Sequence, residues 1–158
     1  MDWTIDEMMA RGSCYKRNQF EALWDGRESL TTVEFLALDA PVEDRAFIVT
    51  LMEGSDVLRL WACDMVESFE GTWPAERDGT VEAIAEIVDQ ARQAVADGRD
   101  EAWYIGAWRK GRGIPGTARG VLHWRGAVAA RLAFKAAHST DPENGEALLA
   151  MLVARLEE

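Results

Sequence analysis

Apolar residues recur along most of this chain at the three- and four-residue steps that place them on one face of an α-helix. The clearest helical stretch begins after Gly79-Thr80 and ends at Gly98, which suits a left-handed helix cap. Its apolar positions are Val81, Ile84, Val88, Ala91 and Val95. Alternation of the kind that marks a half-buried strand is never sustained. We therefore expect an all-α chain, with residues 1–158 packed as a single-domain bundle of about eight helices.

Capping and helix-breaking residues predict where the other helices begin and end. Thr4 with Glu7, and Thr31 with Glu34, have the spacing of a capping box. Further helices are predicted over residues 14–24, 33–38, 42–52, 55–69, 101–108, 117–138 and 142–156. Glycines predict a loop over residues 109–120, and the last two helices would form a C-terminal helix pair over residues 117–156. Because alanine and glycine narrow one side of the 117–138 helix, we expect this helix at the centre of the bundle.

The charges of the chain are unevenly distributed, which bears on its partners. The net charge is −11, yet residues 104–138 contain no acid. Their seven bases are Arg109, Lys110, Arg112, Arg119, Arg125, Arg131 and Lys135. The simpler expectation is that these bases form ion pairs with acids of neighbouring helices. The alternative is that several of them face outward and bind an anion, either a phosphate or the carboxylates of a partner.

The acidic residues also allow two interpretations. A solvated face that keeps the protein soluble is the default. The second is a surface that docks on a basic or nucleic-acid-binding protein and competes there with phosphate groups. The candidate residues are Glu82, Glu86, Asp89 and Asp97, with Trp108 as an aromatic anchor. Tryptophan is enriched both in interface hot spots and in small cores, so both roles stay open for Trp108.

A second candidate site is an anion-binding loop formed by Arg109, Lys110, Arg112 and Arg119. Glycines at 111, 113, 116 and 120 would let backbone amides approach an anion near the start of a helix. The loop lacks the Gly-Lys-Ser/Thr ending of a nucleotide-binding loop, and no predicted strand precedes it. A linker between two helices is therefore the simpler interpretation of the glycines.

Residues for catalysis or metal binding do not form a recognisable set. His123 and His138 lie on one predicted helix, about 22 Å apart at its rise per residue, so they cannot share a metal there. Cys63 has apolar neighbours and is expected in the core rather than as a nucleophile. We expect no enzymatic activity, no metal and no cofactor. The chain has no apolar run long enough to cross a membrane, and its acidic N-terminus has no signal core, which favours the cytoplasm.

Residues 41–98 contain a recognisable sequence pattern. Asp44-Arg45 precedes a helix that reads Leu58-Arg59-Leu60-Trp61-Ala62-Cys63-Asp64, and an alanine-rich helix, Ala83–Ala96, follows before Gly98. Over residues 41–98 the chain thereby resembles the all-helical putative immunity proteins of bacterial toxin systems. This resemblance implies binding and neutralisation of a toxin, often a nuclease, and it implies no catalytic residue. Residues 104–138 have no counterpart in the motif.

An inhibitor of a host defence complex, such as an anti-CRISPR protein of phage or plasmid origin, would meet the same physical requirements. The sequence therefore favours a non-enzymatic acidic protein that binds and inhibits another protein. The alternative is a nucleic-acid or phosphate-binding module that uses the bases of residues 109–135.

Overall fold

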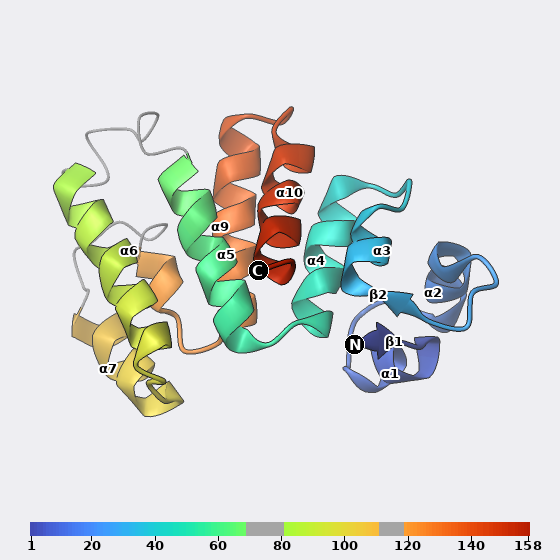
Figure 1. Cartoon of the computed structure of the whole chain (residues 1–158), viewed down its shortest axis with the longest axis horizontal. Coiled ribbons are helices and arrows are strands. Elements are labelled where there is room, and N and C mark those ends of the chain that lie inside the picture. Colours follow the sequence, from blue (N-terminus) through green and yellow to red (C-terminus); the bar gives the residue numbers. More distant parts are fainter. Residues whose placement is uncertain (69–80, 111–118) are drawn as a thin grey trace.

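The computed structural model describes residues 1–68, 81–110 and 119–158, and it is mostly helical over these residues. The helices stand side by side in an elongated row, with α6 and α7 at one end and α1 and α2 at the other (Figure 1). They are α1 (Ile5–Ala10), α2 (Arg17–Trp24), α3 (Thr32–Leu36), α4 (Val42–Met52), α5 (Ser55–Ser68), α6 (Val81–Ala96), α7 (Glu101–Lys110), α9 (Gly126–Thr140) and α10 (Gly145–Leu156). A short 3-10 helix, η2, spans Gly120–Leu122. The prediction of an all-α fold is confirmed.

Both predicted capping boxes are present and begin α1 and α3. The Glu7 backbone N–H donates to Thr4 Oγ1 over 3.2 Å, and the Thr4 N–H donates to Glu7 Oε2 over 2.8 Å. Thr31 and Glu34 make the same pair of bonds. Directly before these boxes, the strands β1 (Asp2–Trp3) and β2 (Leu30–Thr31) pair antiparallel. The sequence did not predict this two-stranded ribbon, because two residues are too few to show alternation.

The centre of the molecule is formed by α4, α5, α9 and α10. Both α9 and α10 pack against α4 and α5, and the contact between α5 and α9 is the most extensive in the described part of the chain. Alanines on one side of α9 are buried: Ala129, Ala130, Ala133 and Ala137. At its start, a side chain on Gly126 would overlap the backbone carbonyl of Ser55, so only glycine allows this approach. The central position predicted for this alanine-rich segment is confirmed.

The predicted helix over residues 117–138 is interrupted, and its predicted start lies outside the described residues. The backbone leaves helical geometry at His123 and is extended at Arg125, and α9 begins only at Gly126. In a continuous helix the carbonyls of Val121 and Trp124 would accept backbone N–H groups. Here the buried Arg59 of α5 donates to both of them, at 2.5 and 3.5 Å. A side chain from a distant helix therefore replaces the local hydrogen bonds.

Other predicted boundaries also differ from the structure. The last helix starts at Gly145, not at Pro142, because Asp141 ends α9 and its carboxylate accepts the Glu143 N–H to form a turn. Gly145 lies directly against the Val42 side chain, which fixes where α10 can begin. The two ends predicted for the loop over residues 109–120 are wrong, because Arg109 and Lys110 still belong to α7 and Gly120 belongs to η2. Residues 111–118 lie outside the described part of the chain.

None of the helices that the structure describes combines the length and apolar composition needed to span a membrane.

Candidate binding surfaces

The outer face of α6 carries a stripe of carboxylates, which we call the α6 acidic stripe: Glu82, Glu86 and Asp89. All three side chains are exposed, and none forms an ion pair with a described residue. At four- and three-residue steps they extend about 10 Å along the helix. The opposite face of α6 is buried against the rest of the protein through Ile84, Ile87, Val88, Ala91 and Ala94. α6 itself lies at one end of the row of helices (Figure 1). Because the stripe is opposite the buried face, its carboxylates face solvent.

Asp97 and Trp108 were predicted to belong to the same surface, but their surroundings differ. Asp97 lies beyond the end of α6, where it accepts a hydrogen bond from Gln93 at 2.8 Å and lies 3.9 Å from Arg99. Trp108 is half-buried in an aromatic cluster with His123 and Trp124. These ring contacts do not join Trp108 to α6. The α6 acidic stripe is therefore defined without Asp97 and Trp108, and the described ring contacts of Trp108 are with His123 and Trp124.

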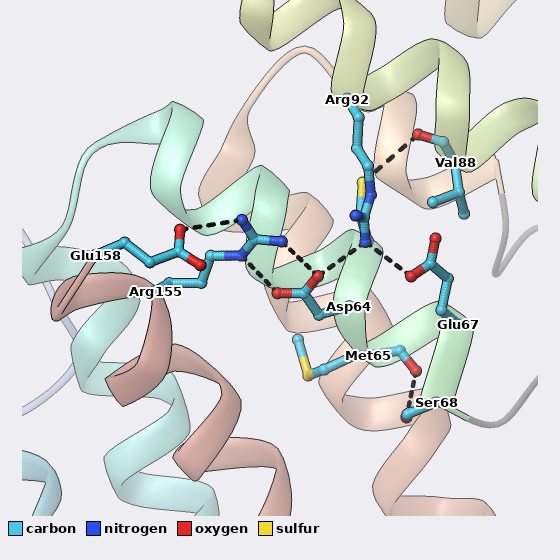
Figure 2. Close-up of polar contacts among 9 residues, drawn as sticks. Asp64, Met65, Glu67, Ser68, Val88, Arg92, Arg155 and Glu158 are labelled. Carbon is cyan, nitrogen blue, oxygen red and sulfur yellow. Dashed lines mark hydrogen bonds and ion pairs between the residues drawn. The ribbon is translucent and has the colours of Figure 1, made fainter.

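A carboxylate on α5 holds α6 in its orientation. Asp64 accepts hydrogen bonds from Arg155 Nε at 2.6 Å and Nη2 at 2.7 Å, and from Arg92 Nη2 at 2.8 Å (Figure 2). Arg92 comes from α6 and Arg155 from α10, and Arg92 also reaches Glu67 at 2.8 Å. The hydrogen bonds to Asp64 raise the pKa of Arg155 above its ordinary value. This arrangement ties both α6 and α10 to α5.

The expectation that the basic segment pairs with acids of neighbouring helices is wrong for its described members. Arg109, Lys110, Arg125 and Lys135 are exposed and form no ion pair within the described residues. The acids near the centre of the protein are instead bound by arginines from elsewhere in the sequence. Arg45, for example, binds Glu146 of α10 and also the carbonyls of Leu36 and Ala40.

The structure describes three of the four residues predicted for the anion-binding loop: Arg109, Lys110 and Arg119. Arg112 lies outside the described residues. Arg119 is half-buried, its Nε donates to the Trp108 carbonyl at 2.8 Å, and its guanidinium lies 4.2 Å from the centre of that indole ring. Arg109 and Lys110 are exposed on the last turn of α7, where a positive charge stabilises the helix end. Two of the four predicted residues are therefore free to meet an anion, and Arg119 serves the packing of Trp108.

Several residues that carry the family resemblance are interior, among them Arg45, Arg59 and Trp61. Arg59 is 1% exposed, and its guanidinium carbon lies 3.6 Å from the centre of the Tyr104 ring. Burial lowers the pKa of Arg59 from its ordinary value, and Tyr104 acts in the opposite direction. Trp61 is fully buried and donates to the Leu148 carbonyl at 2.8 Å, and Asp44 accepts from the Tyr15 hydroxyl at 2.6 Å. The α4 and α5 residues of this motif therefore hold helices together, whereas its α6 part carries exposed carboxylates of the stripe.

Cys63 occupies the core position that the sequence predicts. Its side chain is fully buried, and this burial raises the pKa of the thiol to about 12, so the thiol stays protonated at neutral pH. His123 lies before α9, not within it, and it accepts a hydrogen bond from the Arg125 N–H at Nδ1. Within the described residues, no three histidine, cysteine or acidic side chains converge as metal ligands would.

Comparisons with protein-family models, with curated proteins and with solved structures found no match to this chain.

Proposed function

We propose that this chain is a non-enzymatic binding protein that docks the α6 acidic stripe on a basic or nucleic-acid-binding protein and inhibits it, in the cytoplasm. The observation that carries the proposal is the stripe itself: three exposed carboxylates on one helix face, without ion pairs to described residues. The net charge of −11 adds long-range attraction to a cationic partner and repulsion from nucleic acid. The partial resemblance to immunity proteins is in keeping with this role.

The rigidity of α6 supports the same conclusion. A docking surface loses less entropy on binding when its side chains stand on a fixed element. Here Arg92 anchors α6 to Asp64 and Glu67, and it does so without using a carboxylate of the stripe. The carboxylates are therefore held in place before a partner arrives, and their spacing along the helix is preset.

The test is affinity capture with the tagged chain from its own cells at low and at high salt, followed by affinity measurement with the captured protein. We expect a basic partner that is recovered at low salt and lost at high salt. Changing Glu82, Glu86 and Asp89 together to lysine should weaken binding at least about tenfold, because opposite charges across an interface become like charges. The partner's activity should fall when the wild-type chain is added in equal amount.

A matched control changes Glu21, Glu28 and Glu157 to lysine. These three acids are exposed and lie on other parts of the molecule, so the net charge changes by the same amount. We expect the control to keep most of the affinity. Equal weakening by both triple variants would show that the attraction depends only on net charge. That result, or the recovery of no basic partner at low salt, would refute docking through α6.

A second candidate function is nucleic-acid binding by the basic segment. The observation that favours it is the exposure of Arg109, Lys110 and Arg125 near the His123–Trp124 ring pair, whose centroids are 4.0 Å apart. Half-buried aromatic rings flanked by bases can stack on single-stranded nucleic acid. A gel-shift titration with single-stranded RNA and DNA tests it. Binding should fall steeply with salt and be lost when the three bases become alanine, and unchanged binding in that variant would eliminate the site.

A further inference from the structure

A cavity of about 350 Å³ opens between α4 and α9, on residues that take no part in the α6 acidic stripe. Its apolar lining comes from Ala46, Phe47 and Phe134, and its polar lining includes Arg131, Lys135 and His138. This volume is near the lower end of the range for small-molecule sites, which is roughly 300–1,000 Å³. The cavity therefore has room for a molecule of one or two rings.

The charge of this cavity is opposite to that of the protein. Arg131 and Lys135 both line it, and neither forms an ion pair with a described residue. Its one acid, Glu43, is engaged by His138, whose Nε2 lies 3.0 Å from the Glu43 carboxylate. By contrast, the cavity beside Asp64 is lined by three acids and one arginine. In a chain of net charge −11, a positive cavity is not explained by composition.

Arg131 is held in place without a counterion. Its Nε donates to Thr50 Oγ1 at 2.8 Å, and its guanidinium carbon lies 4.2 Å from the centre of the Phe47 ring. No described residue accepts a hydrogen bond from its two terminal nitrogens. Burial lowers the pKa of this half-buried guanidinium. An anion beside Arg131 would supply the negative charge that no described residue provides. A guanidinium that is already held in place also loses little conformational entropy when it binds a carboxylate.

We propose that this cavity binds a small organic anion with a flat apolar body, such as an aromatic carboxylate. The rings of Phe47 and Phe134 contact the body of the ligand, and Arg131 with Lys135 binds its carboxylate. The apolar lining requires a hydrophobic body, and the two unpaired cations require a negative charge. This site is independent of docking through α6, so one can fail while the other holds.

Titration calorimetry with 2-naphthoate tests the proposal, with 2-naphthamide, 2-naphthylmethylamine and acetate as comparison compounds. We expect naphthoate to bind at least about tenfold more tightly than the neutral amide, because hydrogen bonds between charged groups are the stronger ones. The cationic amine and the small acetate should show no binding. Amide signals of Ala46, Phe47 and Lys135 should shift in NMR spectra when naphthoate is added.

Two variants and a matched control complete the test. Lys135→Glu changes an exposed residue of the cavity, and Arg131→Gln removes the fixed guanidinium; each should weaken naphthoate binding at least about tenfold. Arg125→Glu makes the same charge change as Lys135→Glu just before α9, outside the cavity, and should bind naphthoate as the wild type does. Equal affinity for naphthoate and naphthamide, or equal loss in Lys135→Glu and Arg125→Glu, would overturn the proposal.

Discussion

Arg59 and Asp64 lie five positions apart on α5, and the protein accommodates their charges in opposite ways. Arg59 is 1% exposed and meets the carbonyls of Val121 and Trp124 and the ring of Tyr104, with no ion pair among the described residues. The Asp64 side chain is 20% exposed and is bound by two guanidinium groups. Partial charges on carbonyls compensate a full charge less well than an opposite full charge does. The burial of Arg59 therefore costs more than that of Asp64.

This difference shows what each charge does for the structure. Arg59 sets the path of the chain between η2 and α9. Its guanidinium donates to the Val121 carbonyl, which a backbone N–H would satisfy in a continuous helix. Asp64 sets the orientation of helices that would form without it, since Arg92 and Arg155 belong to regular parts of α6 and α10. A change at Arg59 should therefore disturb the fold more than a change at Asp64, and this order can be tested.

Arg59→Ala should have the largest effect of the changes considered, a loss of about 3–5 kcal/mol in the free energy of unfolding. The substitution leaves a cavity beside Tyr104 and two backbone carbonyls without their donor. Urea unfolding followed by tryptophan fluorescence measures the loss. Arg59→Met keeps much of the packing and should lose less. If Arg59→Met were as stable as the wild type, the guanidinium would contribute nothing net, and the comparison with Asp64 would lose its basis.

Asp64→Asn should have an intermediate effect, a loss of about 1–3 kcal/mol, because two arginines keep their geometry but lose the charge that binds them. Glu67→Gln is the matched control, since it neutralises a more exposed carboxylate that meets Arg92 alone. We expect it to change stability by less than about 1 kcal/mol, as for other surface ion pairs. Equal losses in the two variants, measured by urea unfolding, would show that Asp64 is no more important than a surface acid.

The sequence predicts those parts of the fold that depend on contacts between near neighbours in the chain, and it misses those that depend on distant residues. The capping boxes of α1 and α3 are readable because Thr4 and Glu7, like Thr31 and Glu34, are three residues apart. The buried face of α6 is readable from its helical period. The break before α9 is not, because its cause, Arg59, lies 62 residues from Val121 in the sequence. The alanine-rich sequence after the break favours a helix, and tertiary hydrogen bonds from Arg59 override this local preference before Gly126.

The candidate sites divide in the same way. The exposure of Glu82, Glu86 and Asp89 follows from their place opposite the apolar residues of α6, and sequence alone indicates it. The ion pairs do not follow from the sequence, because composition states how many charges exist but not which of them meet. The cavity between α4 and α9 was missed for the same reason. Phe47 and Arg131 lie far apart in the sequence, and no local motif signals their contact.

Substitution of an exposed capping carboxylate should change stability least. The pH dependence of that change distinguishes such carboxylates from the buried charges. Glu7 and Glu34 are exposed, and hydrogen bonds from the Thr4 and Thr31 backbone N–H groups lower their pKa below the usual 4.5. A lowered pKa means that the folded state holds its proton less tightly than the unfolded state. Their stabilising contribution is therefore complete above about pH 4.5 and is lost as the pH falls through the lowered pKa of the folded state.

Glu34→Gln tests this sign directly, because glutamine can keep a neutral capping box but cannot be ionised. The wild type should have the higher melting temperature at pH 7, and the difference between the two should shrink steadily from pH 5 to pH 3. Circular dichroism melting curves at each pH measure it, with Glu28→Gln, an exposed glutamate without a described hydrogen bond, as the control. A difference that stays constant over this range would mean that the charge of Glu34 does not stabilise the helix. Water would then screen the exposed carboxylates of this chain completely, and only charges as buried as Arg59 and Asp64 would shape its fold.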